Sequence, residues 1–343
     1  MSRNNNEINP TEIYDILIGY WKTGILKAAI ELNVFTEIAS GHTTSDKLAS
    51  SLGVKEKGIR ILLDALCGLK LLGKEKETYT LSPLAKNFLV NTKASYIGDT
   101  AKSFVPREDW NIFVMIGEAL KRGGPLKEGP RATKFWEDVV VGLIPLGVPV
   151  AKTICDLLHI SSSTRKGLKV LDLACGAGIY GYTILQRDHL ATVTDLDLKD
   201  VLGIAKKVAE DMGVADRVTY HAGDIVTSDY GDNTFNIAII SHILQGFDPD
   251  TIKVILNKVY KALSPGGTLV IHEFVPDEER ASKSFPLLFA VYMFLVTPGG
   301  GTYTFSEFSH WLKEVGFSHS MLHDLSGPTS LIIGHKTERE NIS

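Results

Sequence analysis

The sequence predicts an α/β protein with a doubly wound, mostly parallel sheet, preceded by a mainly helical N-terminal part. Three observations carry this prediction. From residue 167 onwards, short runs rich in Val, Ile and Leu alternate with helical stretches, which is typical of a parallel sheet covered by helices. Before that point apolar residues recur mostly at helical spacing. The chain has 343 residues, which fits two domains.

The N-terminal part has the pattern of a winged helix. Apolar residues at helical spacing fill 11–38, and 42–89 reads as helix, Gly turn, helix and short hairpin. A winged helix can bind DNA, or it can act as a packing and dimerisation module. The second interpretation is favoured, because the second helix is apolar on a broad face and its basic residues are offset by Glu56 and Asp64.

Changes of pattern divide the chain into three parts. We assign 1–100 to the winged-helix domain and 101–165 to a helical bridge with a Gly/Pro-rich loop at 122–130. The sheet domain is assigned to 166–343. Six strands are expected there from their apolar runs: 168–176, 191–196, 217–224, 235–241, 267–274 and 329–336.

The bulk composition excludes several classes of protein. With 44% hydrophobic and 22% charged residues the chain is globular, and a net charge of -4 gives no reason to expect nucleic acid. The first residues lack the apolar core of a signal peptide. The longest strictly apolar run, 285–296, has 12 residues, against about 20 needed to span a bilayer. We therefore expect a cytoplasmic protein without a membrane partner.

Neither a disulfide framework nor a metal site is indicated. The three cysteines, Cys67, Cys155 and Cys175, are scattered along the chain. No group of His, Asp and Glu residues has the spacing of metal ligands.

A glycine motif follows the first strand of the sheet domain. The stretch LDLACGAGIYG (171–181) places Gly176, Gly178 and Gly181 where the chain must turn sharply, approach a bound nucleotide and open a helix. The motif fits a dinucleotide and S-adenosylmethionine (SAM) equally well, so other features must separate the two.

Acidic residues at the strand ends favour SAM. Asp172 precedes the glycines, where a carboxylate can hold a cationic amino group but would repel a pyrophosphate. Asp197 ends the next strand and can accept both ribose hydroxyls, a device that NAD-binding folds share. Asp224 ends the third strand and suits the adenine amino group. Together with the turn LSPGGTLVI (263–271), Asp224 makes the domain resemble the class I SAM-dependent methyltransferases.

The chain from about 12 to 336 resembles the dimeric small-molecule methyltransferases. These include plant caffeic acid and flavonoid O-methyltransferases, acetylserotonin methyltransferase and bacterial natural-product enzymes. Segments 62–89 and 297–317 carry the match. The resemblance implies a seven-stranded sheet, a homodimer formed through the winged helix, SAM as cofactor and S-adenosylhomocysteine (SAH) as product.

The resemblance also implies cofactor contacts, which lie on the glycine motif, on the ribose-binding acid and on the pair that brackets adenine. One residue departs from the ribose motif, because Lys199 replaces its proline. The expected contacts are Asp172, Gly176, Gly178, Asp197, Leu198, Asp224, Ile225 and Ser241.

The catalytic pattern of the family is reduced in this chain. Its catalytic histidine becomes Gln245 and a supporting glutamate becomes Thr302, whereas Glu273 matches the carboxylate beside that histidine. An amide cannot take a proton at neutral pH, so Gln245 can only orient an acceptor. His242 and Glu273 are candidate replacement bases. His272 alternates with Glu273 and must point to the other face. For His242 and His272 alike, a hydrogen-bonded structural residue is the favoured interpretation.

Aromatic and methionine side chains from the bridge and from 285–296 favour a flat, apolar acceptor. The same residues at helical spacing also suit a plain hydrophobic core. The expected acceptor contacts are Trp110, Phe113, Met115, Phe289, Tyr292, Met293 and Thr302.

These observations predict a SAM-dependent methyltransferase that acts on the oxygen or carbon of a small aromatic or polyketide-like metabolite, with little or no general-base help from Gln245. The missing base leaves a second hypothesis open, a SAM-binding enzyme of non-methylating chemistry such as pericyclic rearrangement or decarboxylation. A third is a winged-helix regulator, which the intact glycine motif and Asp197 disfavour. The expected partners are a small-molecule acceptor and a second copy of the chain.

Overall fold

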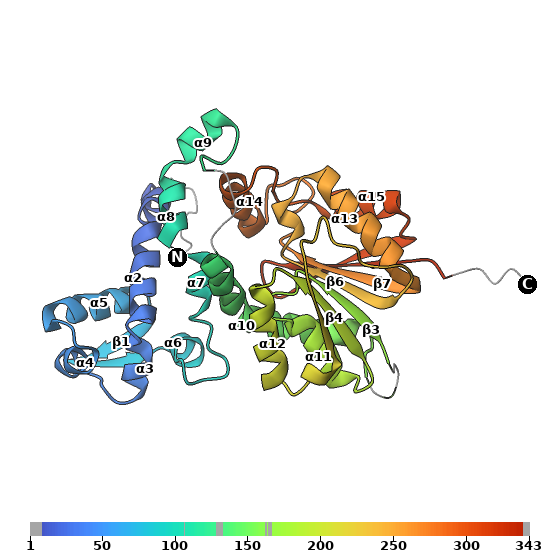
Figure 1. The fold of residues 1–343 in the computed structure, drawn as a ribbon. Coiled ribbons are helices and arrows are strands. Elements are labelled where there is room, and N and C mark those ends of the chain that lie inside the picture. The colour runs from blue at the N-terminus through green and yellow to red at the C-terminus, as the bar shows by residue number, and fades with distance from the viewer. Residues whose placement is uncertain (1–8, 106, 128–132, 162, 164–166, 339–343) are drawn as a thin grey trace, which may run out of the picture. The chain divides into compact units, whose positions relative to one another are not determined.

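A computed structural model describes residues 9–105, 107–127, 133–161, 163 and 167–338. The chain divides into two compact units, Met1–Val105 and Pro106–Ser343 (Figure 1). The division into three parts therefore stays a prediction. Its boundary at 165, and part of the loop at 122–130, lie outside the described residues.

The first unit is a winged helix preceded by three helices. The single helical stretch expected over 11–38 is broken at Ile18 and again at Asn33, which has a left-handed φ of 58°. The wing is antiparallel, with Leu72 opposite Leu81. Its elements are α1 (Thr11–Leu17), α2 (Gly19–Glu31), α3 (Val34–Ala39), α4 (Ser45–Leu52), α5 (Glu56–Gly68), β1 (Leu72–Glu75), β2 (Thr78–Leu81), α6 (Pro83–Phe88) and α7 (Thr100–Phe104).

The apolar stripe of α5 forms the core of this unit. Its buried residues Ile59, Leu63 and Leu66 pack in one cluster with Tyr79 of β2. On the outer side of α5, Asp64 accepts hydrogen bonds from Arg60 at 3.3 Å and from Lys74 at 2.7 Å. These pairs reduce the positive charge that a DNA-reading helix would need.

The second unit contains seven strands and the helices that cover them (Figure 1). Its elements are α8 (Arg107–Val114), α9 (Ile116–Arg122), α10 (Thr133–Leu157), β3 (Lys169–Leu173), α11 (Ile179–Arg187), β4 (Thr192–Asp197), α12 (Val201–Asp211), η1 (Ala215–Arg217), β5 (Val218–Ala222), β6 (Phe235–Ser241), η2 (Leu244–Gly246), α13 (Pro249–Ala262), β7 (Leu263–Glu273), α14 (Ser284–Val296), α15 (Phe305–Val315), β8 (His319–Asp324) and β9 (Ser330–His335).

The strand order β5-β4-β3-β6-β7-β9-β8 confirms the predicted fold class. The five strands from β5 to β7 are parallel, and β9 and β8 are antiparallel to their neighbours. The order reverses between β3 and β6, and in such sheets ligands bind at the carboxyl ends of the strands at that point. The apolar runs did not reveal β8, because HSMLHD (319–324) is largely polar and pairs only at the sheet edge.

Each face of the sheet supplies one hydrophobic core. Along β6, Ile237 and Ile239 pack in a cluster with residues of α10, α11 and α12, whereas Ala238 and Ile240 pack with residues of α13 and α15. Successive side chains of a strand point to opposite faces of the sheet. A parallel strand that is buried on both faces must therefore be apolar at successive positions. This burial explains the near-continuous apolar runs of the sequence.

The longest apolar helix in the described part of the chain is α10, which a count of strictly apolar residues does not reveal. Its stretch Phe135–Leu157 is long and apolar enough, by length and composition, to cross a membrane. Its residues Ile154 and Cys155 are buried in the same cluster as Tyr182 of α11. The core helix of a soluble protein passes the same test by length and composition, so one such helix is weak evidence for a membrane span.

Candidate cofactor and catalytic site

The glycine loop joins β3 to α11 at the switch point of the sheet. Gly178 has a φ of +70° and is the N-cap of α11. A Cβ atom on Gly178 would lie 2.2 Å from Cζ of Tyr182, whose ring is fully buried. The positive φ and the close approach both require glycine at this position.

Asp197 fixes the glycine loop from the end of β4. Its Oδ2 accepts a hydrogen bond from the Gly176 N–H at 2.8 Å, and its Oδ1 accepts one from the Leu198 N–H at 2.7 Å. Burial raises the pKa of Asp197, and the two N–H donors counteract that effect. A contact with the ribose hydroxyls stays a prediction, to which the structure adds an anchoring role.

Asp172 lies below the loop and is buried. Its Oδ2 accepts a hydrogen bond from the Gly181 N–H at 3.1 Å. Asp195 is its register partner on β4, is fully buried and accepts a hydrogen bond from the Tyr182 hydroxyl. Burial raises the pKa of Asp195 to about 7, and burial together with Asp195 raises the pKa of Asp172 well above its ordinary value. The two carboxyl groups therefore resist carrying two full charges.

The predicted adenine pair follows β5. Ile225 is buried in the sheet core, and Asp224 is exposed beside it. The three hydrogen bonds described for the Asp224 carboxylate come from the Val226 N–H and from Thr227, and all go to Oδ1. They hold the turn in place, and the contact of Asp224 with adenine stays a prediction.

A polar cluster lies at the carboxyl ends of β6 and β7. The Nδ1 atom of His272 is 3.0 Å from the hydroxyl oxygens of both Tyr180 and Ser241. Burial, and secondarily His242, lower the pKa of His272 well below its ordinary value, so this imidazole stays neutral.

His242 contacts both of its polar neighbours on β7. Its ring centroid lies 4.3 Å from that of His272, and its Nδ1 lies 3.8 Å from Oε2 of Glu273. The Oε1 atom of Glu273 accepts a hydrogen bond from the Leu244 N–H at 3.0 Å. His272 and Glu273 therefore have separate hydrogen-bond partners, whereas His242 contacts both of them.

Gln245 is held mainly by backbone contacts. Its N–H donates to Glu273 Oε1 at 3.4 Å, and its carbonyl accepts from the Gly301 N–H at 2.9 Å. A Cβ atom on Gly300 would lie 2.4 Å from that carbonyl, so glycine at position 300 is needed for the close approach. The side-chain Nε2 of Gln245 donates to the backbone oxygen of His242 at 3.3 Å.

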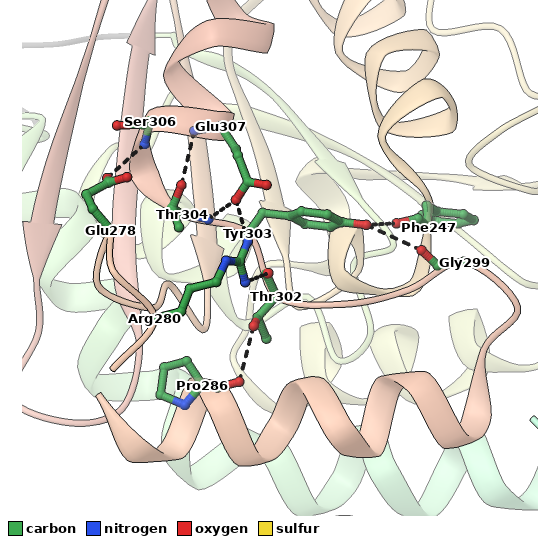
Figure 2. A network of polar contacts seen from close by, with 10 residues as sticks. All are labelled: Phe247, Glu278, Arg280, Pro286, Gly299, Thr302, Tyr303, Thr304, Ser306 and Glu307. Atoms are coloured by element: carbon green, nitrogen blue, oxygen red, sulfur yellow. Dashed lines mark hydrogen bonds and ion pairs between the residues drawn. The ribbon is translucent and has the colours of Figure 1, made fainter. Parts of the chain in front are cut away.

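Thr302 links the segment that leads into α14 with the start of α15 (Figure 2). Its hydroxyl donates to the Pro286 carbonyl at 3.2 Å, and its own carbonyl accepts from Arg280 at 2.8 Å. Arg280 also pairs with Glu307 at 2.6 Å. Thr302 therefore ties the start of α14 to the start of α15, and both its replacement of a family glutamate and its contact with an acceptor stay predictions.

A small void lies behind Glu273. It has no room for a water-sized molecule, so it is not an acceptor pocket. The void is lined by Gln245, Glu273, Phe274, Gly301, Thr302, Tyr303 and Phe308.

Aromatic rings continue from this cluster toward α8. The ring of Phe289 lies 4.5 Å from Phe274 and 5.4 Å from Tyr292. Tyr292 is parallel to Phe113 at 6.2 Å, and its hydroxyl donates to Asp109 at 2.6 Å. Three predicted acceptor contacts, Phe113, Phe289 and Tyr292, thus adjoin one another.

The other predicted acceptor residues differ in exposure. Trp110 is half-buried and Met115 is exposed, whereas Met293 is buried. The alternative of a plain core residue therefore fits Met293 best. The acceptor role of all three stays a prediction.

Sequence reasoning missed Tyr180, Tyr182, Asp195 and Phe274. Asp195 had a signal, because it is a charged residue inside an otherwise apolar strand. Tyr180 and Tyr182 had no such signal, because their partners lie on strands that are distant from them in sequence. Among the described residues, no group of His, Cys, Asp and Glu could hold a metal ion.

Comparison with known proteins agrees with this geometry. Residues 14–91 match the O-methyltransferase dimerisation domain, and residues 152–318 match the O-methyltransferase domain. The 3-hydroxy-5-methyl-1-naphthoate 3-O-methyltransferase of Streptomyces sahachiroi is 28% identical over 90% of both chains. The tetracenomycin polyketide synthesis 8-O-methyl transferase TcmO of Streptomyces glaucescens is 26% identical over 95% of this chain and 97% of its own.

Solved structures share the fold along almost the whole chain. A protein from Nostoc punctiforme superposes with a TM-score of 0.89 at 29% identity, covering 96% of this chain and 100% of its own. Human N-acetylserotonin methyltransferase in complex with SAM gives a TM-score of 0.84 at 18% identity, covering 98% and 100%. The chain therefore belongs to the SAM-dependent O-methyltransferase family that joins a dimerisation domain to a methyltransferase domain.

Proposed function

We propose that this methyltransferase transfers the methyl group of SAM to a hydroxyl oxygen of a fused-ring aromatic metabolite of polyketide type. The row of rings from Phe274 through Phe289 and Tyr292 to Phe113 carries this proposal. Flat aromatic faces suit a flat acceptor by stacking and burial, and would give little to a sugar or an amino acid. The naphthoate and tetracenomycin enzymes among the relatives support the same acceptor class.

SAM is proposed to bind at the switch point between β3 and β6. The glycine loop, Asp197 and the turn after β5 all lie at the carboxyl ends of neighbouring strands. The residues proposed to contact SAM are Asp172, Gly176, Gly178, Asp197, Leu198, Asp224, Ile225 and Ser241.

An acceptor panel tests the proposed function. We expect the enzyme to turn over hydroxynaphthoates and hydroxyanthraquinones with a kcat/KM at least about tenfold above that for single-ring phenols, because an extra buried ring adds at least about 1.4 kcal/mol of contact. Formation of SAH is measured by chromatography. Preference for single-ring phenols would contradict the acceptor class, and acceptor consumption without SAH would support non-methylating chemistry.

We also propose a homodimer formed through the first unit. The helix α1 has no buried residue, and together with the start of α2 it exposes a contiguous apolar set. Apolar surface of this kind marks interfaces. The set consists of Ile13, Tyr14, Ile16, Leu17, Tyr20 and Trp21. The cytoplasmic location expected from the sequence stays a prediction.

Light scattering is expected to give twice the 37.5 kDa chain mass. Ile16→Asp should shift the protein to a monomer, because it places a charge in the apolar set. Val254→Asp, on the exposed side of α13, is the matched control and should leave the dimer intact. A wild-type monomer at micromolar concentration would contradict the proposal.

A further inference from the structure

Four buried polar atoms lack a hydrogen-bond partner at one place in the described structure. They are Nδ1 of His242, Oε1 of Gln245, Nε2 of His272 and Oε2 of Glu273. More than about 90% of buried polar groups in proteins are satisfied, and each exception costs about 1–3 kcal/mol. Their gathering at the ends of β6 and β7 indicates a site kept for chemistry.

The backbone at His242 is held in a costly conformation. Its φ is +52°, in the left-handed region that non-glycine residues avoid at a cost of about 1–3 kcal/mol. The His242 N–H donates to the His272 carbonyl at 2.9 Å, and its own carbonyl accepts from the Gln245 side chain. These contacts fix the ring between His272, Glu273 and Phe274.

Glu273 is oriented for a partner on its second oxygen. Its Oε1 is occupied by the N–H groups of Leu244 and Gln245, and Oε2 faces Nδ1 of His242 at 3.8 Å. A small shift of the ring would close this distance to a hydrogen bond. A buried carboxylate on Nδ1 fixes the tautomer in which Nε2 is free to take a proton.

We propose that His242, oriented by Glu273, is the catalytic base of this enzyme in place of the residue at position 245. The inference rests on the proposed function. Nε2 of His242 takes the proton of the acceptor hydroxyl, and the oxygen lone pair forms a bond to the methyl carbon of SAM. The carbon–sulfur bond breaks, its electron pair stays on sulfur as the neutral thioether of SAH, and His242 later releases the proton to water.

The surroundings favour His242 over the other candidates. His272 is 3% exposed, and its Nδ1 is shared by Tyr180 and Ser241, so it has no route for proton exchange. The His242 side chain keeps 14% of its surface exposed, which provides such a route. The charged or titratable groups that face its ring are His272 and Glu273.

Two naphthols of different acidity test the proposal by rate. With 2-naphthol, a weak acid, His242→Asn should lower kcat by about 10²–10⁴-fold, because that acceptor must lose a proton in the reaction. With a nitronaphthol that is already ionised the loss should be much smaller. Gln245→Ala should cost at most about tenfold with both, the value of one hydrogen bond. His310→Asn, on the exposed face of α15, is the control and should keep the wild-type rate.

Glu273→Gln supplies a second readout. The amide keeps an oxygen for the Leu244 N–H but removes the charge beside His242. The rate with 2-naphthol should drop, because the charge that fixes the tautomer with a free Nε2 is gone. Calorimetry with SAH checks that both variants still bind cofactor.

Nitrogen-15 NMR of labelled histidine decides the inference without turnover. The His242 signal, identified by its absence in His242→Asn, should show the Nδ1–H tautomer in the wild type, and the share of that tautomer should fall in Glu273→Gln. An Nε2–H tautomer, or full activity of His242→Asn on 2-naphthol, would overturn the inference and leave the proposed function standing. A wild type that methylates no naphthol would instead overturn the proposed function, and the NMR result would still decide the role of His242.

Discussion

Replacing Asp197 with alanine is expected to weaken SAH binding by about 10²–10³-fold. SAH would lose the two hydrogen bonds that its ribose is proposed to donate to Asp197, and the Gly176 and Leu198 N–H groups would lose their acceptor. Hydrogen bonds to a charged group contribute about 1.5–3 kcal/mol each, and about 1.4 kcal/mol corresponds to tenfold in affinity. Isothermal titration calorimetry with SAH measures the change.

Asp211→Ala provides the matched control for Asp197. Asp211 ends α12, is exposed, and has a 4.0 Å ion pair with Lys207 that should contribute almost nothing. SAH affinity should therefore equal that of the wild type. If Asp197→Ala also binds SAH as the wild type does, the cofactor does not lie at the carboxyl end of β4.

The second large effect is expected at Gly178. Alanine there would need a left-handed φ and would place its Cβ inside the ring of Tyr182. Backbone strain and overpacking each cost about 1–3 kcal/mol, so the free energy of unfolding should fall by about 2–6 kcal/mol. Urea denaturation measures this loss, and SAH binding should weaken in the same variant.

Gly203→Ala separates this effect from glycine replacement in general. Gly203 lies in α12 with open space around its Cα, and its φ is not positive. Alanine should stabilise the protein there by about 0.4–1 kcal/mol. Equal destabilisation by the two substitutions would show that the loop geometry at Gly178 is not as described.

The fold could be predicted from the sequence where burial is complete. The runs 168–176 and 235–241 are apolar because their strands are covered on both faces, and an apolar run is visible in the sequence alone. Strand β8 gave no such signal, because an edge strand can be polar. The break at Asn33 was missed as well, because a single left-handed residue leaves no periodic pattern.

The cofactor loop could also be predicted, because its glycines and acids are close together in sequence. The catalytic cluster could be predicted only in part. The change to Gln245 stands in the sequence, but the position of His242 between His272 and Glu273 depends on a positive φ and on strand pairing. Contacts between distant residues set those geometries, and no local pattern encodes them.

The family resemblance places its catalytic histidine at Gln245, and the proposed role of His242 explains how an amide can stand there. Gln245 keeps its place through backbone hydrogen bonds to Glu273 and Gly301, so its side chain could change without altering the loop. His242 lies three residues earlier and faces the same carboxylate. With His242 as the proposed base, the cluster would preserve methyl transfer while Glu273 keeps its hydrogen bonds to the Leu244 and Gln245 N–H groups.

The most direct test of methyl transfer to oxygen is the product formed from SAM that carries a carbon-13 methyl group. The enzyme is incubated with this SAM and a hydroxynaphthoate, and the product is examined by carbon NMR. We predict a single labelled methoxy resonance coupled to the former hydroxyl carbon, together with one equivalent of SAH. A labelled methyl on a ring carbon, or labelled SAM left intact while the acceptor is consumed, would contradict the account.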